Sequence, residues 1–273
     1  MKAIEFQHWI EQQLPNPVPE DGVDGIFAGD PQTEVRGVAI TFLPNLFVLQ
    51  EASRRGLNFV IGHEPVFYNH PWDYPKGDDY KILMPTDDLQ QKMGSPPGLA
   101  KQQVIKKHGL VSYRLHDAWN DFPDRGMGLP FEKVLGWQGK RITQNAWIYE
   151  IPPTPLKDLA QDVGKKLGKS GIRFVGEADK IIKRVSLDWG SPGAIELLTR
   201  GLTYGTDAAI TGEVTEWRDV EFARDVGIAL ILGGHHGTET PGMRAFYEWL
   251  VKRRPDLRVE YIDAGDPDAF ITF

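Results

Sequence analysis

"EASRRGLNFVIGHE", residues 51–64, and "FARDVGIALILGGH", residues 222–235, share one plan. In each stretch a helical segment ends at a glycine, Gly56 or Gly227, and glycine suits the left-handed position just after a helix. A five-residue run typical of a buried strand follows, apolar except for Asn58 in the first stretch, and then a second glycine and ionisable side chains. Ligand sites in α/β folds lie at the carboxyl ends of parallel strands. The repeat therefore predicts that two such strand ends form one composite site.

The rest of the chain alternates short apolar runs with longer segments of helical period. The predicted strands are 35–41, 57–61, 110–115, 146–151, 184–189, 207–211, 228–232 and 257–262. The predicted helices are the N-terminal stretch, 44–55, 98–107, 155–167, 193–203, 214–226 and 241–252. This alternation predicts an α/β fold with mainly parallel or mixed sheets.

Composition excludes several classes of function. A net charge of −7, without a basic stripe, argues against nucleic-acid and anionic-membrane partners. There is no cysteine, so any transition metal must be held by nitrogen and oxygen ligands. No apolar run reaches the roughly 20 residues that span a bilayer. The opening stretch, MKAIEFQHWIEQQL, has the apolar spacing of an amphipathic helix rather than a signal peptide, so a cytoplasmic protein is expected.

Five of the seven histidines fall at or just beyond predicted strand ends. They are His63, His70, His116, His235 and His236. This clustering predicts a shared site. In the first window, His63 and Glu64 leave a buried strand and His70 follows; imidazole and carboxylate are good ligands for divalent first-row metals. The alternative is an ordinary polar turn with Glu64 in water.

The second window is "RLHDAWNDFPDRG", residues 114–126. His116 and Asp117 leave a strand, and Asn120 and Asp121 follow in a loop with proline and glycine. The candidate metal ligands here are the imidazole of His116 and the oxygen-bearing side chains of Asp117, Asn120 and Asp121. Aspartate and asparagine also serve turns in such loops, which is the alternative for these residues.

The third window is "GGHHGTETPG", residues 233–242. His235 and Glu239 are four residues apart, and the glycines around them allow the backbone close to a ligand. Thr240 before Pro241 predicts a helix N-cap there, and the alternative for Glu239 is then only a favourable charge near a helix start. In "AAITGEVTEW", residues 208–217, Glu213 follows a strand and is a candidate partner of a metal ligand, or a helix-start residue.

These motifs resemble the Nif-three-like family of dinuclear metal-centre proteins, whose members are often described as type-two GTP cyclohydrolase I. The similarity covers most of the chain and is strongest in "GVAITFLPNLFVLQEASRRGLNFVIGHEP" and "DAAITGEVTEWRDVEFARDVGIALILGGHHGTE". "SYRLHDAWND" and "VSLDWGSPG" match more loosely.

The family pattern is His-His-Pro, then His-x-x-x-Asp, then Gly-His-x-x-x-Glu. The resemblance implies ligand roles for His63, His116, His235 and Glu239. Glu64 stands where the pattern has a second histidine, as in a His-Glu-Pro branch in which Tyr68 and His70 line the site. Asn120 stands where the pattern has aspartate, so Asp117, Asn120 and Asp121 all stay candidate ligands. His236 is a further candidate to line the site.

The resemblance also implies two αβ halves, residues 1–137 and 138–273, with two divalent ions between them, and often a homo-hexamer.

Two ions sharing a carboxylate, Glu239 or Glu64, would activate a bound hydroxide for hydrolysis of a nucleotide or related small molecule. Zinc, manganese and iron are candidates, and the additional oxygen ligands favour manganese or iron. One expectation for Tyr68, Trp72 and Tyr74 is an aromatic wall for a flat substrate, and the alternative is that they only pack their own loop. Two other hypotheses stay open: a non-catalytic metal-handling protein, and a regulatory scaffold with structural metals.

Overall fold

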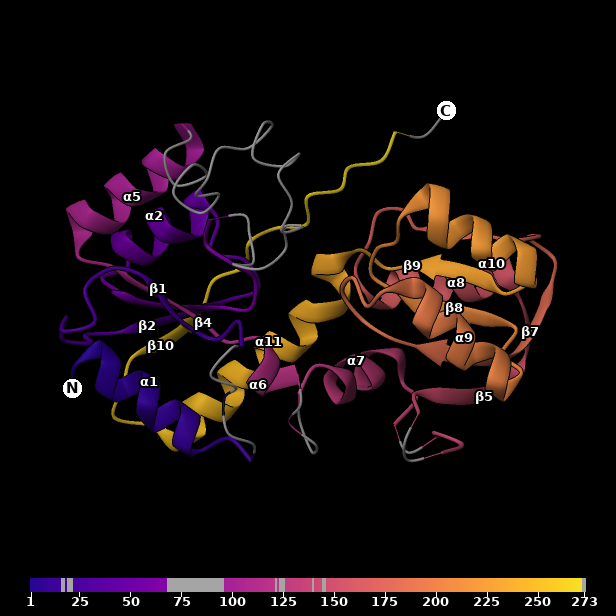
Figure 1. Ribbon diagram of the computed structural model, residues 1–273, viewed down its shortest axis with the longest axis horizontal. Coiled ribbons are helices and arrows are strands. Elements are labelled where there is room, and N and C mark those ends of the chain that lie inside the picture. The colour runs from indigo at the N-terminus through magenta and orange to yellow at the C-terminus, as the bar shows by residue number, and fades with distance from the viewer. Residues whose placement is uncertain are drawn as a thin grey trace, which may run out of the picture. The chain divides into compact units, whose positions relative to one another are not determined.

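The computed structural model describes residues 1–15, 18, 22–67, 96–120, 122, 126–138, 140–143 and 146–271. The chain forms two compact units (Figure 1). Unit 1 comprises Met1–Gly126 and Met243–Ala264, and unit 2 comprises Met127–Gly242 and Gly265–Phe273. Each unit contains a five-stranded mixed sheet with helices, so the predicted α/β class with two similar αβ halves is confirmed. Among the described helices, none combines the length and apolarity needed to cross a membrane.

The sheet of unit 1 has the order β1-β4-β3-β2-β10. Its strands are β1 (Gly25–Ala28), β2 (Val38–Thr41), β3 (Phe59–Gly62), β4 (Val111–Arg114) and β10 (Val259–Tyr261). The β1–β4 pair is antiparallel, and the other three pairs are parallel. The carboxyl ends of β2, β3 and β4 therefore lie along one edge of this sheet.

Helices cover both faces of the unit 1 sheet. These helices are α1 (Ala3–Gln12), α2 (Leu46–Arg54), α5 (Pro96–His108), α6 (Asp117–Asn120) and the later part of α11 (His235–Arg253). One face carries Ala39 and Val60 and packs against α2 and α5 (Figure 1). On the other face Phe59 contacts the ring of Phe6 from α1 at 5.3 Å. Alternate strand residues thus serve two separate apolar layers.

The sheet of unit 2 has the order β5-β7-β8-β9-β6. Its strands are β5 (Ile148–Pro155), β6 (Arg173–Val175), β7 (Ile181–Leu187), β8 (Ala208–Thr211) and β9 (Ala229–Leu232). The three central strands are parallel, and both edge strands run antiparallel to their neighbours. The sheet is therefore mixed, with a parallel centre like that of unit 1.

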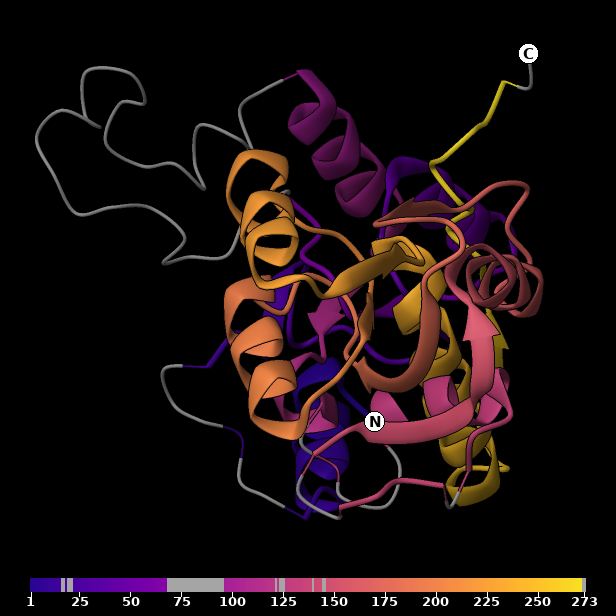
Figure 2. The ribbon, with the colours of Figure 1, turned by 90° about the vertical axis from the view of Figure 1, so that its right-hand side faces the viewer.

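Both faces of the unit 2 sheet are buried. The helices of this unit are α7 (Gly128–Leu135), α8 (Leu156–Lys166), α9 (Ala194–Tyr204), the π-helix η1 (Glu216–Val220), α10 (Glu221–Val226) and the start of α11. Ala208 and Ile210 of β8 pack with α7 and α8, whereas Ala209 packs with α9 and α10. Figure 2 shows α8 and the α9–α10 pair on opposite sides of the strands.

The repeated helix–glycine–strand plan of residues 51–64 and 222–235 is present in both units. Gly56 has φ of +74° after α2, and Gly227 has φ of +73° after α10. Each residue ends its helix in the left-handed region, as glycine allows. The strands that follow, β3 and β9, are central strands with buried residues. The local sequence rule therefore holds at both positions.

Several details differ from the sequence expectations, and the strands β1 and β6 and the helices α6 and α7 were not predicted. The compact units are not contiguous, because β10 pairs in parallel with β2 and so joins residues 243–264 to unit 1. The expected helix start at Thr240–Pro241 is wrong: α11 begins at His235 and contains Pro241. Gly234, at φ +76°, makes the turn, and the N–H of Thr238 already donates to the Gly234 carbonyl at 3.1 Å.

Candidate metal centre

The pairing of β3 with β4 brings two of the predicted histidines together. Gly62 lies opposite Arg114 in the parallel register, and the N–H of Leu115 donates to the Gly62 carbonyl at 2.9 Å. Both strands end at the same sheet edge, so His63, directly after β3, and His116, two residues after β4, leave it side by side. Their rings stack with centroids 4.3 Å apart and planes 22° apart.

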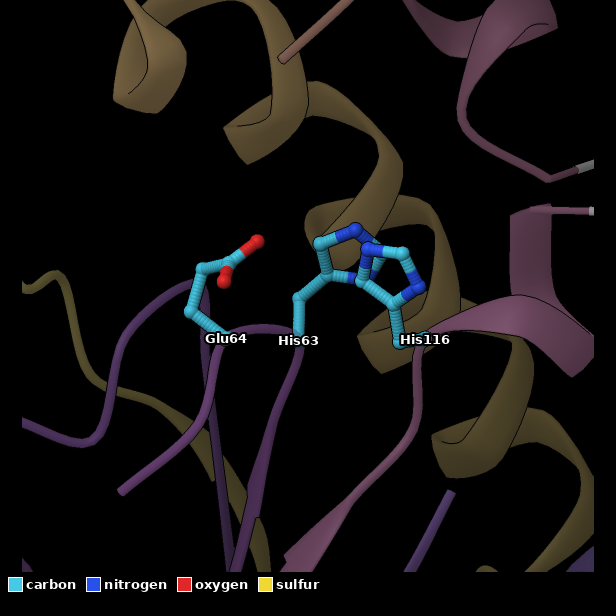
Figure 3. A group of neighbouring side chains, drawn as sticks. All are labelled: His63, Glu64 and His116. Atoms are coloured by element: carbon cyan, nitrogen blue, oxygen red, sulfur yellow. The ribbon is translucent and has the colours of Figure 1, made fainter. Parts of the chain in front are cut away.

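Glu64 completes a group of three potential ligands in unit 1. One donor atom each from His63, Glu64 and His116 lies within 4.8 Å of the others. Figure 3 shows the carboxylate and both rings on the same side of the strand ends. Donor atoms around one zinc-sized ion, with bonds of about 2.1 Å, lie up to about 4 Å apart, so only small side-chain movements separate this group from a ligand set.

Hydrogen bonds orient both rings. His63 is fully buried, and its Nδ1 lies 3.1 Å from the Leu115 carbonyl oxygen. The Nδ1 of His116 lies 2.7 Å from Oδ1 of Asp117. In both cases Nδ1–H donation leaves Nε2 as the nitrogen for a metal, which is the common arrangement around metal-binding histidines. Asp117 therefore lies where it orients His116, outside the group of three.

Burial favours the ligand form of His116. Desolvation is the largest cause that lowers the pKa of this imidazole, and the nearby His63 acts in the same direction. The hydrogen bond to Asp117 opposes both effects. A lowered pKa keeps the ring neutral at neutral pH, and the neutral imidazole is the form that binds metals.

Asp24 holds the loop that carries His116. Its carboxylate accepts hydrogen bonds from the N–H groups of His116 and, at 3.1 Å, Ala118. Burial raises the pKa of Asp24, while these two backbone hydrogen bonds act to lower it. Asp24 lies 92 residues before His116, and no local motif marks it in the sequence. It reaches the site because β1 pairs with β4.

Arg114 places a buried positive charge beneath the same group. Its side chain is 2% exposed, its Nε donates to the His63 carbonyl at 2.9 Å, and its guanidinium lies 3.6 Å from the Glu64 carboxylate. A buried arginine requires hydrogen bonds and an opposite charge. Glu64 is therefore placed both as a partner of Arg114 and as a potential metal ligand.

Unit 2 holds the second group, at the carboxyl ends of its parallel strands. His235 begins α11, and its Nε2 lies 3.2 Å from Oε2 of Glu239, one helical turn later. The Nδ1 of His235 lies 2.9 Å from Oε1 of Glu213, which follows β8. Glu239 is 3% exposed. Glu239 therefore faces the Nε2 side of the ring, where an imidazole and a carboxylate suit a divalent ion, whereas Glu213 contacts the opposite, Nδ1 side.

The loop after β7 closes tightly around this second group. Gly190 has φ of +60°, and a Cβ added there would collide with Oε1 of Glu239 and approach His235 Nε2 to 3.0 Å. The N–H of Gly190 donates to Thr238 Oγ1 at 3.0 Å, and its carbonyl accepts from the N–H of Glu213 at 2.9 Å. The space occupied by the two ligand side chains thus exists because residue 190 lacks a side chain.

Asp188 and Arg200 flank the loop. An Arg200 nitrogen donates to Oδ2 of Asp188 at 2.9 Å. Burial raises the pKa of Asp188, the N–H of Trp189 and Arg200 act to lower it, and the nearby charge of Glu239 raises it further. Asp188 therefore adds a third carboxylate to the surroundings of Glu239 within unit 2.

The other candidate site residues predicted from the sequence lie outside these two groups or outside the described residues. Asn120 ends α6, and its N–H donates to the His116 carbonyl at 2.9 Å. His236 is half-buried beside His235 and interacts electrostatically with Asp266. Tyr68, His70 and Asp121, together with Trp72 and Tyr74, lie outside the described residues. The sequence did not single out five residues around the two groups: Asp24, Arg114, Asp188, Gly190 and Arg200. The one indication was the stretch "VSLDWGSPG", which contains the Asp188–Gly190 loop and matches the family loosely.

One prediction follows from the His116–Asp117 pair. Asp117→Asn removes the charge that orients and polarises the ring, so we expect the affinity for zinc or manganese to fall about 10- to 100-fold, the usual effect of such partners. Calorimetric metal titration measures it. Asp30→Asn, at an exposed position of the same unit, is the matched control. Equal affinities in the wild type and Asp117→Asn would show that Asp117 does not act on the metal through His116.

Comparisons with known proteins identify the family of this chain. The sequence profile of the family described as Duf34/NIF3 (NGG1p interacting factor 3) matches residues 89–267, more than half of the chain. A protein of Salmonella typhimurium LT2 called GTP cyclohydrolase 1 type 2 homolog is 33% identical over 271 residues, covering 98% of this chain and 100% of its own. A protein of Escherichia coli K12 with the same name is 25% identical over the same shares.

A solved structure shares the fold. The crystal structure of a Bacillus cereus protein related to NIF3 superimposes with a TM-score of 0.75 at 14% identity, covering 100% of this chain and 99% of that one. At this identity the similarity concerns the architecture alone.

Proposed function

Because the chain belongs to the Duf34/NIF3 family, we propose that it binds two divalent metal ions and uses them to hydrolyse a small molecule of the nucleotide type. The observation that carries this proposal is the group of His63, Glu64 and His116, whose donor atoms lie within 4.8 Å of one another. Both of its rings make Nδ1 hydrogen bonds that leave Nε2 for a metal.

The ligand assignment combines both groups. His63, Glu64 and His116 would hold metal from unit 1, and His235 and Glu239 from unit 2, with Glu239 or Glu64 as the shared carboxylate of the pair. The donor set fits divalent ions, because every member is an imidazole or a carboxylate. Zinc, manganese and iron all accept such ligands, and the carboxylates favour manganese or iron.

The residues around the ligands have defined tasks in this proposal. Asp117 and Glu213 hold the rings of His116 and His235 through Nδ1. Arg114 offsets the charge of Glu64, and Gly190 leaves room for Glu239. Bound divalent ions would supply Lewis-acid activation of water and of a substrate oxygen.

The test compares metal forms of one preparation. Metal-free protein is reloaded with manganese, iron or zinc and assayed against a panel of nucleotides and phosphoesters. The panel includes GTP, because the curated relatives are called GTP cyclohydrolase 1 type 2 homolog. We expect turnover of at least one substrate that requires metal and disappears in His116→Phe. Turnover that is equal in the metal-free protein would contradict the proposal.

A second candidate function is metal handling without catalysis. The contact between Arg114 and Glu64 supports it, because a carboxylate that also neutralises a buried cation would bind metal more weakly and release it more readily. Rapid, reversible exchange of bound zinc with a competing chelator, with no turnover in the substrate panel, would favour this function over hydrolysis.

The protein's assembly and location stay predictions. We propose a homo-oligomer, a hexamer by resemblance, in the cytoplasm, with a small-molecule substrate as its ligand. Light scattering coupled to size-exclusion chromatography would give a mass about six times 30.7 kDa for the hexamer. A mass of 30.7 kDa would contradict it.

A further inference from the structure

A buried lysine follows the end of α8 in unit 2. The Lys169 side chain is only 4% exposed, and its Nζ lies 2.9 Å from Oδ1 and 2.8 Å from Oδ2 of Asp266. A second carboxylate, Asp268, lies 3.6 Å away. Burying an ammonium is costly unless carboxylates accompany it. The segment after β10 supplies both, and the N–H of Asp268 also donates to Asp266 at 3.1 Å.

The same lysine packs against the turn that carries His235. A Cβ added at Gly234 would lie 2.6 Å from Lys169 Nζ, and one added at Gly237 would lie 2.9 Å from its Cε. Leu167 packs against the same turn, because a Cβ added at Gly233 would lie 2.7 Å from Cδ1 of Leu167. The two glycines on either side of His235-His236 thus leave the space that Lys169 fills.

Charge explains why the two aspartates are needed here. An ammonium beside the first turn of α11 faces the positive end of the helix dipole, which is unfavourable. Asp266 and Asp268 offset this repulsion. Burial acts to raise the pKa of Asp266, yet the hydrogen bond from Lys169 and the nearby His236 hold it below its usual value. The carboxylate therefore stays ionised beside the lysine.

We infer that Lys169, held by Asp266 and Asp268, is a positioning residue for His235. It acts through the backbone of Gly234 and Gly237, fixing the turn from which the ring of His235 reaches Glu213 and Glu239. The inference rests on the proposed function, in which His235 and Glu239 hold metal.

The test measures zinc and manganese affinity by calorimetric titration of the full chain. In Lys169→Met and in the double variant Asp266→Asn with Asp268→Asn we expect a loss of about tenfold, the lower end of the effect of groups that orient metal ligands. Lys169→Arg keeps the charge and should retain most of the affinity. The matched control is Lys157→Met, which breaks an exposed pair with Asp179 in the same unit and should change nothing.

A second readout needs no metal. Hydrogen–deuterium exchange of the metal-free protein should become faster at residues 233–240 in Lys169→Met and in the double aspartate variant, with an unchanged rate at β8. If the wild type binds no metal, the proposed function fails, and exchange alone decides whether Lys169 positions the turn. If Lys169→Met does not fold, the double aspartate variant decides. Unchanged affinity together with unchanged exchange overturns the inference.

Discussion

The double variant His235→Ala with Glu239→Ala should lose its divalent ions while keeping its fold. Removing two ligands costs more than removing a partner of a ligand, so we expect the metal affinity to fall by more than about 100-fold. His235 is partly exposed, and the alanine at 239 leaves space next to Gly190 rather than a collision. We therefore expect the free energy of unfolding of the metal-free protein to change by less than about 2 kcal/mol.

Metal content by mass spectrometry and thermal unfolding of the metal-free protein measure these two effects. The control is His8→Ala with Glu248→Ala, which removes one histidine and one glutamate at exposed positions of α1 and α11. This control should keep full metal content. Undiminished metal in the His235–Glu239 variant would refute the assignment of these residues as ligands.

His116→Phe tests the group in unit 1 without leaving a hole. Phenylalanine keeps a flat ring of similar size against His63, where the imidazoles now stack at 4.3 Å, but it offers no nitrogen. We expect metal affinity at the unit 1 group to fall by more than about 100-fold, because a ligand and its link to Asp117 are both lost. Cobalt substitution followed by absorption spectroscopy reports the change in ligands directly.

His108→Phe serves as the matched control, since His108 is an exposed residue at the end of α5 in the same unit. Its cobalt spectrum should equal that of the wild type. A His116→Phe spectrum that is also identical to the wild type would show that His116 is not a ligand.

The central part of each unit could be predicted from the sequence because its signals are local. Gly56 and Gly227 each end a helix in the left-handed region, and the apolar runs that follow become β3 and β9. The parallel pairing of such strands then brings their carboxyl ends together, which places His63 beside His116. This step needs only the rule that ligand sites lie at those strand ends.

Other parts depend on contacts that local patterns do not encode. The sequence patterns did not predict β1 and β6. Both are short edge strands without a long apolar run, and they pair antiparallel with β4 and β9. Asp24 reaches His116 only through the first of these pairings. The expected N-cap at Thr240 was wrong because the chain already turns at Gly234, so that α11 begins at His235 and Thr240 lies inside the helix.

The departures from the family pattern also have physical consequences that only the folded structure reveals. Glu64, in place of a histidine, lies 3.6 Å from the buried Arg114, which comes from the end of the neighbouring strand. Asp117, rather than Asn120, is the side chain that contacts His116 through its Nδ1. The sequence left Asp117, Asn120 and Asp121 as equal candidates, because all three oxygen-bearing side chains fall within one short loop.

The most direct test is a crystal structure of the zinc-loaded protein with anomalous data at the zinc absorption edge. We expect anomalous peaks about 2.1 Å from the Nε2 atoms of His63 and His116, and within bonding distance of His235 and the Glu239 carboxylate. Peaks at other side chains, with none at these four residues, would contradict the ligand assignment.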